Sequence, residues 1–110
     1  KFLEDSFSVV SKSEIVFDKQ QNASLCMLNI KEGPDIELVS GEVVKNLISK
    51  GISYYHSCYV VQNINKVVKD LENKREITLV SPPKPAILFD NQLVAFFYTP
   101  IGLIELLEQR

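Results

Sequence analysis

The chain has 110 residues, of which 45% are hydrophobic and 24% are charged, and its formal net charge is −2. This length suits one small domain with a single core, and the composition lies within the range of soluble globular proteins. The weak negative charge gives no long-range attraction to nucleic acid or to an anionic membrane, and no apolar run approaches the roughly 20 residues of a membrane-spanning helix. We therefore expect neither nucleic acid nor membrane as a partner.

Residues 1–6, KFLEDS, have the composition of a helix end but are too short to form a stable helix alone. No Met precedes them, and no basic segment followed by an apolar stretch marks a secretory signal. We interpret them as the tail of a helix that begins upstream, so we expect the sequence to be the later part of a longer chain. The two cysteines, Cys26 and Cys58, fall in strand-like apolar runs, which favours buried thiols in a cytoplasmic protein.

Three apolar runs rich in strand-forming residues follow, and each predicts a β-strand. They are Phe7–Phe17, Ala23–Ile30 and Ile36–Val39. The polar residues Ser11–Glu14 interrupt the first run, and a polar turn at Asp18–Asn22 ends it. Gly33-Pro34-Asp35 is a strong turn signal before the third run.

A helix is predicted over residues 41–51, where four apolar residues recur at helical spacing. They are Val43, Val44, Leu47 and Ile48. Ser40 offers an N-cap and Gly51 a C-terminal stop. We interpret this segment as a connector between two halves of the chain.

The next strand is predicted over Tyr54–Val61, with His56 and Cys58 on one face and Tyr55 and Tyr59 on the other. A second helix follows, in which Asn63 is the expected cap. Its apolar stripe consists of Ile64, Val67, Val68 and Leu71. A helix with such a stripe is expected to cover one face of a sheet.

The last part of the chain predicts four further strand segments, separated by turns. They are Glu76–Val80, Ala86–Phe89, Leu93–Tyr98 and Ile101–Arg110. The prolines between the first two segments are expected to forbid regular ladder pairing. In the final strand, Glu105 shares a face with Leu103 and Leu107. A carboxylate on an apolar face is costly unless a cation, a metal or a hydrogen-bond donor compensates it.

The tripeptide Ile36-Glu37-Leu38 recurs 68 residues later as Ile104-Glu105-Leu106, and Leu3-Glu4 recurs at the same spacing as Leu71-Glu72. We interpret these matches as an internal duplication. They divide a single domain over 1–110 into a partial first module (1–40), the connector (41–51) and a second module (52–110). A position 68 residues before His56 precedes Lys1, so the opening strand of the first module is expected to lie outside this sequence.

Four segments, YYHSCYVV, NINKVVKDLENK, PPKPAILFDNQLVAFFYTP and IGLIELLE, carry a resemblance to a known group of proteins. The chain resembles the vicinal oxygen chelate superfamily, the glyoxalase, bleomycin-resistance and dioxygenase group, and most of all its methylmalonyl-CoA epimerase-like branch. The resemblance covers nearly the whole chain. It implies an α+β fold of paired βαβββ modules that form a curved mixed sheet around one divalent metal, with the opening strand of the first module absent here.

The resemblance also implies functional residues. His56, Glu105 and Glu37 take the places of three metal ligands, and the fourth, usually a His, is expected upstream of Lys1. Such a nitrogen and oxygen set suits Zn, Co, Ni, Mn or Fe. The implied activity is that of a lyase or isomerase that moves a proton alpha to a carbonyl of a small acyl or thioester substrate, with Glu105 as the catalytic carboxylate. Lys84 lies in the loop nearest a plausible pocket mouth, where it could contact a substrate phosphate or carboxylate.

Other interpretations of the same residues stay open. His56 could be a hydrogen-bonded core histidine, Glu105 could pair with a Lys or Arg, and Glu37 could belong to a polar strand start. The chain also departs from many epimerases, because it has Tyr98-Thr99-Pro100 where they have His-Pro. The alternative functions are a non-catalytic protein that binds an antibiotic-like small molecule and a metal dioxygenase. Exposed sheet edges are expected to favour a homodimer.

Overall fold

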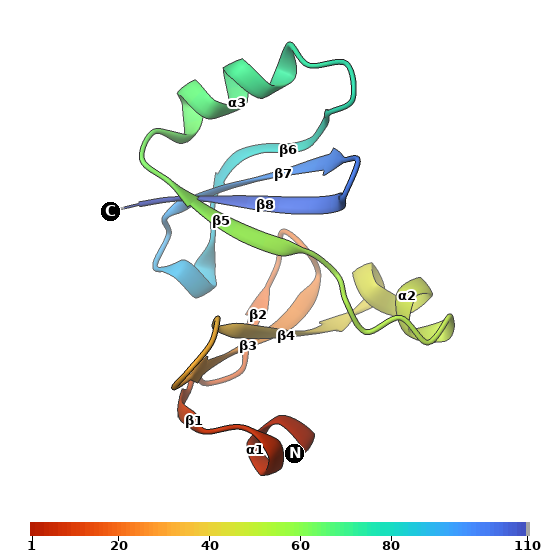
Figure 1. Ribbon diagram of the computed structural model, residues 1–110, viewed down its shortest axis with the longest axis vertical. Coiled ribbons are helices and arrows are strands. Elements are labelled where there is room, and N and C mark those ends of the chain that lie inside the picture. The colour runs from red at the N-terminus through yellow and green to blue at the C-terminus, as the bar shows by residue number, and fades with distance from the viewer. Residues whose placement is uncertain (110) are drawn as a thin grey trace. The chain divides into compact units, whose positions relative to one another are not determined.

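The computed structural model describes residues 1–109. The chain divides into two compact units, Lys1–Gly51 and Ile52–Arg110, each of which contains one four-stranded sheet (Figure 1). The fold is α+β, as the sequence analysis predicts. None of the helices within residues 1–109 is long and apolar enough to cross a membrane.

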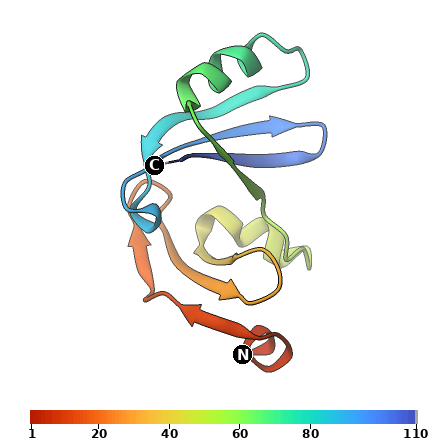
Figure 2. The same cartoon turned by 60° about the vertical axis from the view of Figure 1, so that its left-hand side comes forward.

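The sheet of the first unit is antiparallel throughout. Its elements are α1 (Phe2–Ser6), β1 (Val9–Lys12), β2 (Val16–Asp18), β3 (Ala23–Ile30), β4 (Ile36–Gly41), the 3₁₀ helix η1 (Glu42–Val44) and α2 (Lys45–Ser49). β1 and β2 follow one another in the chain and both pair with β3, which also pairs with β4 (Figure 2, red to orange). The predicted strand over Phe7–Phe17 is therefore confirmed as two pieces.

Two hydrogen bonds between Ser13 and Met27 hold the segment between β1 and β2 against β3. At the break, Ser13 donates its backbone N–H to the Met27 carbonyl, and its Oγ accepts from the Met27 N–H at 2.8 Å.

Asp18, expected in a polar turn, instead ends β2 and is buried. Its carboxylate accepts hydrogen bonds from the Gln20 N–H and from Gln21 Nε2, each at 2.9 Å, which satisfies the buried charge.

The connector differs from its prediction at its start. Ser40 belongs to β4 and does not cap a helix, and the chain turns at Gly41 instead. Gly41 has φ +149°, and a Cβ at this position would lie 2.8 Å from the Asn22 carbonyl oxygen. The backbone geometry and the close approach therefore both require glycine. The helix itself is split into η1 and α2, and Gly51, at φ +74°, follows it as expected.

The second unit contains a mixed sheet with one helix over it (Figure 1). Its elements are β5 (Ser57–Val61), α3 (Ile64–Glu72), β6 (Thr78–Pro85), the 3₁₀ helix η2 (Ile87–Phe89), β7 (Leu93–Thr99) and β8 (Gly102–Glu108). The strand order is β5-β8-β7-β6, with β5 parallel to β8 and the other pairs antiparallel. The core of this unit is formed by Ile64, Val68, Ala95, Phe97 and Leu106. α3 therefore covers the face of the sheet that carries Leu106, as its apolar stripe predicts.

Four predictions for the second unit are wrong. β5 begins at Ser57, so Tyr54 to His56 precede the strand, and Cys58 is exposed where a buried thiol was expected. β6 continues through the prolines, with register shifts in its pairing to β7. Ala86–Phe89 is not a strand, because η2 and a left-handed turn at Asp90 and Asn91 occupy this part of the chain.

The strands of the two units follow one another in a similar order, and the internal duplication itself stays a prediction. Moving β3 forward by 68 residues places it on 91–98, which overlaps β7, and the same shift places β4 on 104–109, which overlaps β8. β1 and β2 together fall on 77–80 and 84–86, the region of β6. Within residues 1–51 there is no counterpart of β5.

Candidate metal site

Glu105 lies in the middle of β8, between Cys58 of β5 and Phe96 of β7 in the strand ladders. Its neighbour Leu106 belongs to the core beneath α3, and Ile104 packs against that core. Because side chains alternate along a strand, Glu105 points to the opposite face of the sheet. Its residue exposure is only 4%, so its carboxylate is withdrawn from water. The sequence prediction of a carboxylate on an apolar face is confirmed.

His56 immediately precedes β5, and its side chain is 7% exposed. Its Nδ1 lies 3.9 Å from Glu105 Oε1, which is too long for a hydrogen bond. This buried nitrogen has no hydrogen-bond partner within the described part of the chain. Burial lowers the pKa of His56, and the backbone of Ser57 opposes that shift. The neutral imidazole, which is the metal-binding form of histidine, is thereby favoured.

The His56 and Glu105 pair fits a divalent cation. Histidine nitrogens and carboxylate oxygens lie about 2.0–2.2 Å from such a cation, so two ligands of one cation are separated by at most about 4.2 Å. The observed 3.9 Å satisfies this limit. Within either unit, no three His, Cys, Asp or Glu side chains of residues 1–109 gather to hold a metal by themselves. The pair can therefore supply two ligands, and others would have to come from elsewhere.

Glu37, the third predicted ligand, lies in β4 of the first unit opposite Met27, much as Glu105 lies opposite Phe96. The pKa of Glu37 is raised, first by burial and then by the negative charge of Asp18. A carboxylate in this environment gains from a nearby cation. Because Glu37 and Glu105 belong to different units, their participation in one site stays a prediction.

Lys84 lies in β6 opposite Val94. Val94 and Phe96 share a face of β7, and Phe96 is opposite Glu105, so Lys84 is on the Glu105 face of the sheet. It is exposed and forms none of the ion pairs found among residues 1–109. The Lys84 ammonium group therefore belongs to the same face of the sheet as Glu105, and its role in substrate binding stays a prediction.

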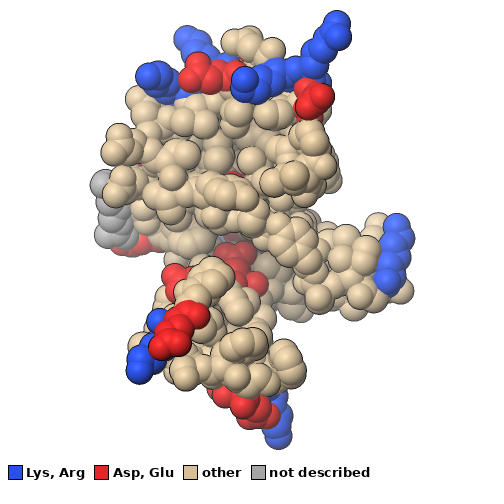
Figure 3. All heavy atoms as spheres, viewed as in Figure 1, with Lys and Arg blue, Asp and Glu red and all other residues tan. Residues whose placement is uncertain are grey.

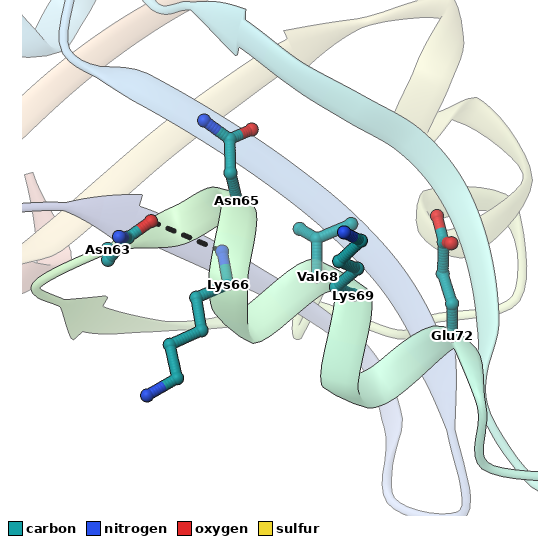
Figure 4. Close-up of a pocket in the computed structure, with 6 residues that line it drawn as sticks. All are labelled: Asn63, Asn65, Lys66, Val68, Lys69 and Glu72. Carbon is teal, nitrogen blue, oxygen red and sulfur yellow. Dashed lines mark hydrogen bonds between the residues drawn. The ribbon is translucent and has the colours of Figure 1, made fainter.

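A surface hollow of about 620 Å³ lies elsewhere, along α3 (Figure 4). It is lined by Asn63, Asn65, Lys66, Val68, Lys69 and Glu72. Figure 3 shows charged side chains of both signs gathered over α3. Because α3 covers the face of the sheet opposite to Glu105, this hollow is separate from the His56 and Glu105 pair.

Two aromatic residues at the site were not identified as functional from the sequence. The rings of Tyr55 and Phe96 both meet the His56 ring edge to face, at centroid distances of 4.6 and 5.1 Å. Strand alternation placed Tyr55 on the face opposite to His56, which is wrong because both residues precede β5. Phe96 could have been found from the register of β7 and β8, since it is the ladder neighbour of Glu105.

Comparison with known proteins supports the fold. No protein-family model matches the chain, and no curated protein does. Among solved structures, the chain is similar to methylmalonyl-CoA epimerase from Mycobacterium tuberculosis, with a TM-score of 0.73 and 18% identity over 99% of this chain and 77% of that one. A hypothetical protein from Bacillus halodurans C-125 is similar with a TM-score of 0.70 and 18% identity, over 99% of this chain and 81% of that one. The chain therefore has the vicinal oxygen chelate fold, as the resemblance predicts.

Proposed function

We propose that this protein is a metal-dependent enzyme of the epimerase and glyoxalase type, which moves a proton alpha to the carbonyl of an acyl thioester. The observation that carries the proposal is the buried pair of His56 and Glu105, in which an imidazole nitrogen without a hydrogen-bond partner among residues 1–109 faces a carboxylate oxygen at 3.9 Å. The similarity in fold to an enzyme named as a methylmalonyl-CoA epimerase supports the class of reaction.

In this proposal, His56 and Glu105 hold the cation. The bound cation would stabilise negative charge on the carbonyl oxygen as the alpha proton leaves. Glu105 Oε1 faces His56, and we assign proton transfer to the other oxygen of this carboxylate. The alpha C–H bond breaks, the proton passes to Glu105, and the electron pair enters the carbonyl group as an enolate. Glu105 can exchange this proton with solvent and return one to the same face, and donation from a water molecule on the opposite face would invert the carbon centre.

Lys84 supports a substrate with a second negative charge. Strands lie about 4.8 Å apart and rise about 3.3 Å per residue, so the backbones of Lys84 and Glu105 are roughly 12 Å apart on the same face. A lysine side chain extends over about half of this distance. An acyl thioester that also carries a carboxylate or a phosphate would therefore place its reacting carbon near Glu105 and its second anion near Lys84.

The experiment is deuterium exchange at the alpha carbon of methylmalonyl-CoA in D₂O, measured by mass spectrometry with the Co²⁺-loaded protein. We expect exchange by the natural protein and a loss of at least about 100-fold in Glu105→Gln, because acid–base groups contribute factors of this size. His56→Ala should lose the bound metal. Lys84→Met should raise KM for this substrate and leave the metal content unchanged.

Glu76→Gln is the matched control, because Glu76 is an exposed carboxylate of the same unit, outside the site. Its exchange rate should equal that of the natural protein. Full exchange by Glu105→Gln, or retained metal in His56→Ala, would overturn the proposal. Thermal protection by the thioester without any exchange would identify a binding protein instead.

A further inference from the structure

We propose that Phe96, assisted by Tyr55, is the positioning residue that fixes His56 and Glu105 in the geometry that a cation requires. This inference rests on the proposed metal site and deepens it, since it names the side chains that orient the ligands. Phe96 is not itself a ligand and is not expected to contact the reacting atoms.

One side chain is placed against both members of the pair. Phe96 is the ladder partner of Glu105, and directly opposed residues of an antiparallel pair have Cβ atoms about 4.5–5.5 Å apart on the same face. The Phe96 ring also meets the His56 ring edge to face, with 5.1 Å between centroids and 83° between planes. The position of Phe96 therefore fixes where the imidazole lies relative to the Glu105 carboxylate.

His56 needs such support because the strand ladder does not hold it. The pairing of β5 with β8 begins at Ser57, one residue later in the chain. Its buried Nδ1 has no hydrogen-bond partner among the described residues that could orient the ring. Tyr55, the preceding residue, meets the imidazole at 4.6 Å between centroids. Among residues 1–109, the two aromatic rings and the backbone of Ser57 thus contribute to orienting the imidazole.

Contacts that orient metal ligands affect affinity strongly, and their loss typically weakens metal binding 10–100-fold. Phe96→Leu keeps an apolar side chain at this position but removes the flat ring that meets the imidazole. We expect Co²⁺ affinity to fall by about 10–100-fold in this variant. The visible absorption bands of bound Co²⁺ should also change, because they report the geometry of the ligands.

The experiment measures Co²⁺ affinity by competition with a chelator, the visible spectrum of the Co²⁺ complex, and thermal unfolding of the metal-free protein. Tyr98→Leu is the matched control: Tyr98 lies two residues further along the same face of β7 and is 57% exposed. Its affinity and spectrum should equal those of the natural protein. Phe96→Tyr retains the ring and should restore both affinity and spectrum. A residue that only stabilised the sheet would lower the unfolding temperature without changing the spectrum.

Tyr55→Leu provides a second variant if Phe96→Leu does not fold, because Tyr55 lies outside the strand ladder. It should weaken Co²⁺ binding and alter the spectrum in the same direction. Natural affinity and spectrum in Phe96→Leu, or in Tyr55→Leu if only that variant folds, would overturn this inference. His56→Ala separates a failure of the metal site from a failure of the positioning role. If it loses the metal while the aromatic variants bind normally, the metal site stands and the positioning role is wrong; if it retains the metal, both are wrong.

Discussion

Glu37 and Glu105 occupy corresponding places in the two sheets, but their surroundings differ. Glu105 faces the His56 imidazole, whereas Glu37 experiences the negative charge of Asp18 in addition to its own burial. Both causes disfavour the ionised form of Glu37. In the metal-free protein, the charge on this residue is therefore a source of instability, and a bound cation would relieve it.

The pH dependence of stability tests this explanation. A pKa of Glu37 raised above its ordinary 4.5 means that the folded chain binds this proton more tightly than the unfolded chain. The contribution to stability is present at pH below 4.5 and is lost as the pH rises through the raised pKa. Glu37→Gln keeps the side-chain shape and removes the charge. We expect the metal-free variant to be more stable than the natural protein at pH 7.5, with a smaller difference at pH 4, measured by urea unfolding.

Glu32→Gln is the control for this measurement. Glu32 is an exposed carboxylate in the turn before β4, so its replacement should leave the pH profile of the natural protein unchanged. A Glu37→Gln profile that coincides with that of the natural protein over this range would show that burial of Glu37 has no energetic consequence.

The sequence identifies the site residues one at a time better than it identifies their contacts. Strand alternation correctly puts Glu105 on an apolar face, because it depends only on the local period of the strand. The approach of His56 depends on the parallel pairing of β5 and β8, which joins segments 47 residues apart in the chain. The sequence does not mark Phe96 as a site residue, because a phenylalanine in a strand is usually a core residue. Only the register reveals that it is the neighbour of Glu105.

At the scale of elements, α3 is the segment whose local signals agree most completely. Asn63 Oδ1 accepts a hydrogen bond from the Lys66 N–H, which is the contact that an N-cap residue makes. Ile64 and Val68 are buried against the sheet. Capping and apolar periodicity thus fix the start and the buried face of the same helix.

Replacement of the cap measures its contribution. Asn63→Ala leaves the Lys66 N–H without its acceptor and should lower the free energy of unfolding by about 1 kcal/mol, within a range of about 0.5–2. For a domain of this size the unfolding temperature should fall by roughly 4–8 °C per kcal/mol, as followed by circular dichroism. Asn65→Ala is the control, because Asn65 is exposed on the same turn and does not cap the helix. An equal fall in both variants would contradict the capping role.

Strand predictions from the local sequence are wrong where the position in the sheet or a turn decides the structure of the segment. β3 is predicted with its observed bounds, because an uninterrupted apolar run lies between two polar turns. β6 is predicted to break at its prolines, yet it continues because it is a terminal strand, where a missing N–H leaves no partner unsatisfied. η2 replaces a predicted strand because Ala86 O accepts hydrogen bonds from both the Phe89 and Asn91 N–H groups, which closes the chain into a turn.

At the scale of the whole molecule, the fold is retained at a sequence identity of only 18% to both solved structures. Cores tolerate extensive substitution when volume and hydrophobic patterning are kept. The pattern of buried positions in β3, β7 and β8 can therefore specify this fold although no family model matches the chain. For the same reason, the fold alone leaves the substrate open, and the functional proposal depends on the individual side chains of the site.

The two terminal strands of the second sheet differ in how well they resist pairing with another chain. This difference identifies the edge that could form the predicted homodimer. β6 carries three prolines, whereas the terminal strand β5 is uncharged and exposes Tyr59 and Val60. Uncharged apolar edges favour pairing between chains, and a lysine on such an edge opposes it. We therefore expect Val60→Lys to reduce the mass measured by light scattering from two chains to one. Val60 is 62% exposed, so the lysine can be accommodated without burying a charge.

Val80→Lys, on the proline-containing edge, is the control and should remain a dimer. A natural protein with the mass of one chain, or a Val60→Lys variant that remains dimeric, would show that β5 does not mediate self-association.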